Sequence, residues 1–279
     1  MGIVDAHVHL WDTGVVHLSW FRDELGLARS ATAADFAAAA GDVAPATAVT
    51  VQAGDTLGEA RWLLDETTRV GVGSVAVLQY EAAKGRWAGV MQDALEATDT
   101  RMPRVGGIRV STPSGAADLS DVRWLDRLAA RLAHSSRVLE LLVRPEQLGA
   151  TAELARRHPS LAVVVCHLGL GSAQPDSAWR RDLSRLARVP NVAAKLSGVV
   201  AGRDAAALRE VVGAAVDALG PDRLLFGSDW PISARSLGYA EVVERTAAAL
   251  PGLSAADTRS LWRRTAERLY RIELSPGAR

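Results

Sequence analysis

The sequence has very little cysteine and no excess of charge of either sign. Among its 279 residues there is a single cysteine, Cys166, which excludes an internal disulfide and a cysteine-based zinc site. Lys and Arg together number 32, and Asp and Glu also number 32, so no net positive field attracts nucleic acid or anionic lipid. We therefore expect no nucleic-acid partner. The cysteine content is typical of a reducing compartment, which predicts a cytoplasmic protein.

Long apolar runs are also missing. No apolar stretch approaches the roughly 20 residues that a membrane-spanning helix needs, so we expect a soluble protein without a membrane partner. No basic segment followed by an apolar one precedes the first extended run, which argues against a secretory leader. A length of 279 residues suits one large domain with a buried core, such as an eight-stranded α/β barrel.

The sequence does contain a regular alternation of extended and helical patterns. Extended apolar segments are predicted at 2–12, 48–52, 74–79, 105–110, 138–143, 162–167, 191–196 and 223–229. Helical patterns are predicted at 32–40, 57–70, 87–97, 121–133, 145–158, 177–187, 205–219, 239–250 and 255–270. Strands that are apolar on both faces are typical of a parallel sheet covered by helices. We predict an α/β protein with a single (β/α)8 TIM-barrel domain over residues 1–279. An open doubly wound sheet is the alternative, although no Gly-x-Gly-x-x-Gly follows the first strand.

Histidine and aspartate side chains lie near the ends of several predicted strands. His7 and His9 are two residues apart in the first strand, so they project to the same face, together with Asp5. Two imidazoles on one face form half of a divalent-metal site or of a polar catalytic site. In α/β barrels the chemistry takes place at the carboxyl ends of the strands, and later strands bring His167 and Asp229 to that rim. These four residues are our candidate reaction centre.

Other side chains near the strand ends are candidates for substrate contact. Arg109 and Lys195 are suited to hold a carboxylate or hydroxyl groups, and Gln52 offers a neutral hydrogen-bonding group. Trp11 and Trp230 directly follow the histidine and aspartate segments, where an indole ring can stack on a sugar or pyrone. Structural roles compete with these assignments: an ion pair for either cation, and a plug of the barrel mouth for the two tryptophans.

Two further features have structural interpretations beside the functional ones. Glu140 lies inside a predicted strand, where a buried carboxylate is expected to pair with Arg or Lys rather than act as an acid catalyst. Residues 13–30 form a long stretch without periodicity, which fits a lid or binding loop as well as a surface excursion. Arg144 and Glu146 fit either loop structure or the rim of the pocket.

Five segments carry a resemblance to a known superfamily. They are Asp5-Ala6-His7-Val8-His9, Val143-Arg144-Pro145-Glu146, Cys166-His167-Leu168-Gly169, Lys195-Leu196-Ser197-Gly198 and Gly227-Ser228-Asp229-Trp230-Pro231. In this order they resemble the motifs of the amidohydrolase superfamily, and most of all its amidohydrolase-related branch of sugar lactonases and pyrone-dicarboxylate lactonases. The branch often has Asp where this chain has Cys166. The chain also has no lysine at the end of the fourth strand and no histidine on the seventh, so the resemblance does not extend to a binuclear metal centre.

The resemblance implies that His7, His9, His167 and Asp229 form the reaction centre. Either they bind one divalent metal, with zinc as the first choice, or the histidines polarise a carbonyl directly and the catalysis is metal-independent. The implied activity is that of a hydrolase in carbohydrate metabolism. It would open the ring of a small-molecule substrate, a sugar 1,4- or 1,5-lactone, with Asp229 as the general base toward water.

Two alternatives to a lactonase stay open at this point. A related branch uses a similar set of residues in metal-dependent decarboxylases of aromatic or muconate-type acids. A barrel that binds a small ligand without turnover is the other alternative. The helical outer faces of such barrels often form dimers, which makes a homodimer a candidate assembly, but the sequence does not report the oligomeric state.

Overall fold

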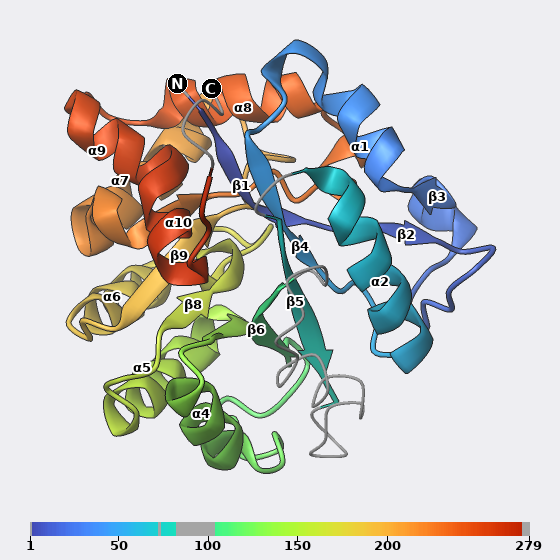
Figure 1. Cartoon of the computed structure of the whole chain (residues 1–279). Coiled ribbons are helices and arrows are strands. Elements are labelled where there is room, and N and C mark those ends of the chain that lie inside the picture. The colour runs from blue at the N-terminus through green and yellow to red at the C-terminus, as the bar shows by residue number, and fades with distance from the viewer. Residues whose placement is uncertain (1, 72–73, 82–103, 275–279) are drawn as a thin grey trace.

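The computed structural model describes residues 2–71, 74–81 and 104–274. Eight parallel strands form one sheet in the order β1-β4-β5-β6-β7-β8-β9-β10, with helices packed around its outside (Figure 1). The strands are β1 (Val4–Val8), β4 (Thr47–Val51), β5 (Val75–Tyr80), β6 (Arg104–Ser111), β7 (Val138–Leu142), β8 (Val163–Val165), β9 (Val192–Leu196) and β10 (Leu224–Phe226). The strand order follows the chain, so the predicted (β/α)8 barrel is confirmed.

The helices agree closely with the predicted patterns. They are α1 (Ala33–Ala40), α2 (Leu57–Val70), α4 (Leu125–His134), α5 (Leu148–Arg157), α6 (Ser177–Ala187), α7 (Ala205–Leu219), α8 (Tyr239–Ala249), α9 (Ala255–Arg259) and α10 (Thr265–Tyr270). A π-helical turn, η7 (Ser260–Arg264), divides the helix predicted over 255–270. The helix predicted over 87–97 lies outside the described residues. Within the described ranges, no helix combines the length and apolar character that crossing a bilayer requires.

The interior of the barrel is filled by small branched side chains from alternate strand positions. Val49, Val75, Val138 and Val164 belong to one buried cluster, which Tyr270 of α10 also joins. Tyr270 packs close to Gly106 and Val75, at the beginning of β6 and β5, so α10 covers the amino-terminal end of the barrel. The carboxyl ends of the strands are left to form the mouth, where barrels of this type carry their chemistry.

The barrel closes between β10 and β1 through hydrogen bonds next to the mouth. The Asp229 amide donates to the His7 carbonyl (2.9 Å), and the His9 amide donates to the Trp230 carbonyl (2.7 Å). Asp5 Oδ1 accepts from the amides of His7 (3.0 Å) and Ser228 (2.9 Å), while the register of β1 against β4 shifts between Asp5 and Val8. Asp5 therefore links β1 to the segment that follows β10. Regular alternation along the strand predicted instead that Asp5 joins His7 and His9 on one face, and the shift in register explains the difference.

The first strand is shorter than predicted, and the segment after it belongs to another sheet. β1 ends at Val8, and β2 (Trp11–Asp12) pairs antiparallel with β3 (Ser30–Ala31). The segment between β2 and β3 contacts the barrel again at Trp20, whose Nε1 donates to the carbonyl of Ala53 at 2.9 Å. From this stretch Trp20 lines the cavity at the mouth, and the choice between a binding loop and a surface excursion stays a prediction.

Candidate active site

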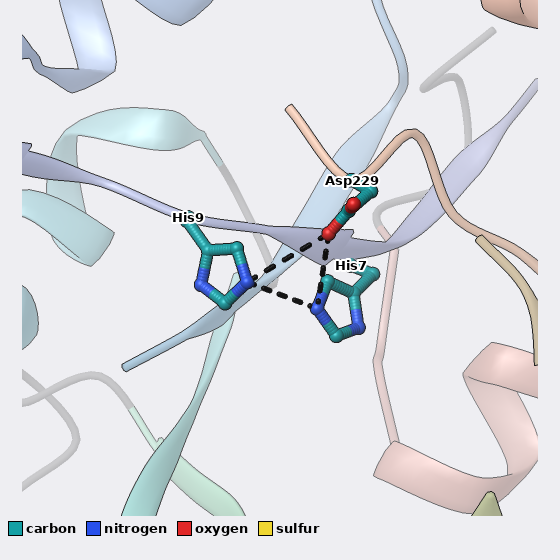
Figure 2. A group of neighbouring side chains, drawn as sticks. All are labelled: His7, His9 and Asp229. Carbon is teal, nitrogen blue, oxygen red and sulfur yellow. Dashed lines mark hydrogen bonds and ion pairs between the residues drawn. The ribbon is translucent and has the colours of Figure 1, made fainter. Parts of the chain in front are cut away.

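Four side chains from opposite ends of the chain meet at the mouth. Nε2 of His7 and Nε2 of His9 are 3.1 Å apart, and they lie 3.6 and 3.8 Å from Asp229 Oδ1 (Figure 2). Nε2 of His167 is 3.8 Å from the same oxygen, and its ring centroid is 4.7 Å from that of His7. The structure thus brings together all four residues of the predicted reaction centre.

The backbone is unusual at two of these four residues. His167 has φ 54° and Asp229 has φ 59°, both in the left-handed region that residues with a Cβ rarely occupy. Each lies just beyond its strand, since β8 ends at Val165 and β10 ends at Phe226. Such conformations cost on the order of 1–3 kcal/mol each and concentrate at functional sites. Here they direct an imidazole and a carboxylate back to one centre.

A glycine makes room for the His167 ring. A Cβ added at Gly198 would lie 2.6 Å from His167 Nδ1, and Gly198 itself has φ 62°. Both the space and the backbone conformation therefore require glycine at this position. Ser197 Oγ lies 2.9 Å from the same His167 nitrogen and fixes the orientation of the ring.

Burial controls the protonation of the centre. It lowers the pKa of His7 and His9 well below the usual value and that of His167 to about 3, and the charges of Lys195 and Arg109 lower them further. Burial also raises the pKa of Asp229 to about 7, an effect that the Arg109 charge opposes. The centre at neutral pH therefore combines three neutral imidazoles with a carboxyl group that gains or loses a proton readily.

The spacing of these groups suits a divalent metal ion. Nε2 of His7, Nε2 of His9 and a carboxylate oxygen of Asp229 lie within 4.8 Å of one another. In a tetrahedral zinc site with bonds of about 2.0–2.1 Å, ligand atoms are roughly 3.3 Å apart. The observed separations of 3.1, 3.6 and 3.8 Å are close to this value. His167 is outside this group of three, although its Nε2 is 3.8 Å from Asp229 Oδ1. Imidazole and carboxylate are also the donors that zinc accepts.

A cavity opens from this centre. It has a volume of about 750 Å3, and His9, His167, Asp229 and Arg109 line it. This volume is in the range of small-molecule sites. Its wall also carries hydroxyl groups and a second guanidinium, from Ser111, Ser172, Ser233, Ser236 and Arg235. The cavity therefore combines apolar side chains with several hydrogen-bonding groups that can bind a small, oxygen-rich molecule.

Arg109 is the predicted substrate contact that lines this cavity. Its side chain is held by neutral groups only: Nε donates to Gln79 Oε1 (3.0 Å), and Nη2 donates to the carbonyl oxygen of Gln52 (2.5 Å). Among the described residues no carboxylate forms an ion pair with it. Arg109 as a whole is 4% exposed, so its positive charge is largely removed from solvent, and the residue lines the cavity.

The other predicted contacts lie behind the cavity wall. Lys195 is fully buried and its Nζ is 2.6 Å from Glu140 Oε1, which confirms the prediction that Glu140 pairs with a cation. The side-chain nitrogen of Gln52 donates to the Thr56 backbone carbonyl and to the Glu59 carboxylate. The side-chain oxygen Oε1 of Gln52 accepts a hydrogen bond from the backbone amide of Gln79. Gln52 therefore positions Arg109 through its backbone, and neither Gln52 nor Lys195 belongs to the lining.

The two tryptophans also pack away from the cavity. Trp11 is fully buried, with its ring 5.7 Å from that of Trp20, and Trp230 packs against Phe36 at 5.3 Å. This placement corresponds to the structural interpretation rather than to stacking on substrate. Trp20, from the excursion between β2 and β3, lines the cavity instead.

Several lining residues were not predicted from the sequence. Ser111 follows Arg109 by two residues at the end of β6, so alternation along the strand could have identified it. Ser233 and Arg235 lie in the 3-10 turn η6 (Ser233–Arg235) that follows Asp229. No local pattern distinguishes them from other loop residues.

Comparison with known proteins agrees with this arrangement. The sequence profile described as Amidohydrolase matches residues 4–272. The chain belongs to the amidohydrolase family. As a member of this family it is a hydrolase.

Two curated relatives and one solved structure illustrate the similarity. An L-fucono-1,5-lactonase of Burkholderia multivorans is 37% identical over 172 residues, which make up 55% of this chain and 57% of that protein. An L-fucono-1,5-lactonase of Burkholderia ambifaria is 32% identical over 253 residues, 82% of this chain and 80% of that protein. A crystal structure of a Burkholderia multivorans amidohydrolase with bound zinc matches with a TM-score of 0.81 and 28% identity, covering 98% of this chain and 100% of that one.

Proposed function

We propose that this amidohydrolase is a lactonase that opens the ring of a small sugar lactone. The observation that carries the proposal is the convergence of three neutral imidazoles on the Asp229 carboxylate, at a cavity that is also lined by Arg109 and several serines. Ester hydrolysis needs a group that accepts a proton from water and groups that stabilise a developing oxyanion. The two relatives named L-fucono-1,5-lactonase support a sugar 1,5-lactone as the substrate class, with 1,4-lactones as near analogues.

In this proposal Asp229 is the general base. Its Oδ1 faces the Nε2 atoms of three imidazoles at 3.6 to 3.8 Å, and these separations hold the carboxylate beside the centre. Arg109 binds the carbonyl oxygen or the carboxylate that forms on ring opening, because it is a buried cation held by neutral groups. The cavity hydroxyls, such as those of Ser111 and Ser233, are placed to bind the hydroxyl groups of a sugar.

A divalent metal fits the same centre. His7, His9 and Asp229 would hold it, with His167 beside the same Asp229 oxygen, and the zinc in the Burkholderia multivorans amidohydrolase supports zinc as the ion. Such an ion, when bound, acts as a Lewis acid toward a carbonyl oxygen and toward water. The protein's own part is to hold the donors in place: Val51 orients His9 through a contact of 2.7 Å with Nδ1, and Ser197 orients His167.

The test is a screen of sugar 1,4- and 1,5-lactones with metal-analysed protein and a pH indicator, since ring opening releases a proton. We expect turnover of at least one lactone, and a loss of about 100- to 10,000-fold in kcat for Asp229→Asn, the usual contribution of a general base. Asp42→Asn, which removes an exposed carboxylate away from the mouth, is the matched control and should keep full activity. Undiminished turnover in Asp229→Asn would remove this residue from the mechanism.

The same screen separates the proposal from its alternatives. Release of carbon dioxide from an aromatic or muconate-type acid, without hydrolysis of any lactone, would favour a decarboxylase. Binding of lactones without turnover would favour a barrel that only binds its ligand. A homodimer, a cytoplasmic location and the lack of a nucleic-acid partner stay predictions, of which light scattering in solution tests the first.

A further inference from the structure

A buried network lies directly behind His7. Lys195 Nζ is 2.6 Å from Glu140 Oε1, and both side chains are fully buried. The same carboxylate accepts a hydrogen bond from the Tyr270 hydroxyl (2.5 Å) and another from Cys166 Sγ (3.4 Å). Three donors directed at one carboxylate are the environment of an ionised Glu140, and the neighbouring ammonium of Lys195 balances its charge.

The Lys195 ammonium also contacts the imidazole of His7. Nζ lies 3.3 Å from His7 Nδ1. An ammonium group has three hydrogens and no lone pair, so it donates and the ring nitrogen accepts. Nδ1 of the neutral His7 ring therefore carries the lone pair, and its hydrogen is on Nε2, the nitrogen that faces the reaction centre.

His9 has the opposite arrangement. Its Nδ1 is 2.7 Å from the carbonyl oxygen of Val51, which only accepts, so the hydrogen of His9 is on Nδ1. Its Nε2 then carries a lone pair toward the centre. In the absence of a metal, the 3.1 Å between the Nε2 atoms of His7 and His9 allows the N–H group of one ring to face the lone pair of the other.

We propose that Lys195 is a positioning residue that holds His7 with its hydrogen on Nε2. The two histidines of the first motif then differ in function, because His9 presents a lone pair and His7 presents an N–H group. An imidazole binds a metal through a nitrogen that carries a lone pair, so coordination by His7 requires its hydrogen to move from Nε2 to Nδ1. The Lys195 contact therefore weakens the binding of a metal by the centre, without removing His7 from the set of donors. The inference rests on the contacts of this chain and holds whichever substrate the enzyme uses.

The first test is made on the wild-type, metal-free protein. Two-bond 1H–15N correlation spectra of protein labelled at histidine distinguish the two neutral tautomers of each ring. We expect His7 to carry its hydrogen on Nε2 and His9 to carry it on Nδ1, with the signals assigned from His7→Asn and His9→Asn. A spectrum with the His7 hydrogen on Nδ1 would overturn the proposal without any variant of Lys195.

The second test measures zinc affinity by competition with a chromogenic chelator. Lys195→Met, which keeps the length of the side chain but cannot donate to His7, should bind zinc about 10- to 100-fold more tightly. The size is that of the loss seen when a group that supports a metal ligand is removed, but the sign is opposite, because Lys195 holds the unfavourable tautomer. The double variant Lys195→Met/Glu140→Gln removes both charges and should also bind more tightly. This separates the tautomer from the net charge of the network.

Arg180→Met is the matched control, because it breaks the exposed ion pair of Arg180 with Glu210 far from the mouth. Its zinc affinity should equal that of the wild type. Unchanged or weaker zinc binding in both Lys195 variants would contradict the proposal. Neither the spectra nor the zinc affinities require turnover. If no lactone is hydrolysed in the screen, these two measurements still test the role of Lys195.

Discussion

Buried charges are paired in the layer beneath the barrel mouth, which we call the lower layer and which contains Lys195 and Glu140, but they are not paired at the mouth itself, as far as the described residues show. In the lower layer Lys195 and Glu140 are both fully buried, and they form an ion pair of 2.6 Å. At the mouth Arg109 is held by the side chain of Gln79 and the carbonyl of Gln52, both neutral. Asp229 likewise faces neutral imidazoles instead of a cation at ion-pair distance, as far as the described residues show.

This contrast separates structural charges from functional ones. A buried charge without an opposite charge is expensive to keep, because the protein interior does not replace its hydration. It is tolerated where a ligand supplies the missing partner. The unpaired charges at the mouth therefore indicate the binding site, whereas the paired charges beneath it hold the strands and His7 in place.

The largest effect on stability is expected in the lower layer. Glu140→Ala leaves the Lys195 ammonium buried without a partner, so the free energy of unfolding should fall by about 3–5 kcal/mol. Urea denaturation measures this change. Replacing both members, in Lys195→Met/Glu140→Leu, should recover most of the loss, since an apolar pair of similar volume needs no charge compensation. A loss below 1 kcal/mol for Glu140→Ala would show that the lower layer is not held by its ion pair.

At the mouth, Gly198→Ala should have its main effect on catalysis. The new Cβ would lie 2.6 Å from His167 Nδ1 and displace the ring. A displacement of about 1 Å costs on the order of 100-fold in rate, equivalent to roughly 2.7 kcal/mol. The positive φ adds about 1–2 kcal/mol of destabilisation. Gly213→Ala in α7, where the methyl group meets no atom within 4 Å, is the control and should leave kcat/KM unchanged.

A third change addresses the unpaired cation. Arg109→Gln should raise KM for the lactone by about 10- to 100-fold, because a hydrogen bond to a charged group contributes roughly 1.5–3 kcal/mol. Arg109→Lys keeps the charge but not the fork that contacts Gln79 and Gln52, so its KM should lie between those of Arg109→Gln and the wild type. Equal KM values for all three proteins would mean that this charge does not meet the substrate.

The reaction centre could be predicted from the sequence because its residues follow the order of the strands. His7, His167 and Asp229 each lie at or just beyond the end of a strand, and all strands of a parallel barrel end at the same rim. The direction of the side chain next to a site residue could not be predicted in the same way. Trp230 directly follows Asp229, yet the left-handed backbone at Asp229 turns the next residue onto Phe36.

The pairing beneath the mouth depends on contacts that no local pattern reports. Glu140 and Lys195 come from β7 and β9, which are separated in the sheet by β8 and face each other across the interior of the barrel. Lys195 follows a strand pattern like that of the other site residues, so the sequence predicted a substrate contact. Only the position of Glu140 and Tyr270 shows that its ammonium is directed away from the cavity.

The smallest effect is expected for an ion pair on the outer surface. Asp126 of α4 accepts from Arg157 Nε (3.0 Å) and lies 2.9 Å from His158 Nε2, and these contacts lower its pKa below the usual 3.8. Its side chain is 61% exposed, so after solvent screening Asp126→Asn should cost less than about 1 kcal/mol at pH 7. Because the folded pKa is lowered, the contribution is present above the unfolded pKa and disappears as pH falls through the folded one. Thermal unfolding at neutral and acidic pH measures the difference. A loss comparable to that of Glu140→Ala at neutral pH would show that pairing alone, without burial, makes a charge structural. A loss that persists in acid would show that the effect does not come from the charge of Asp126.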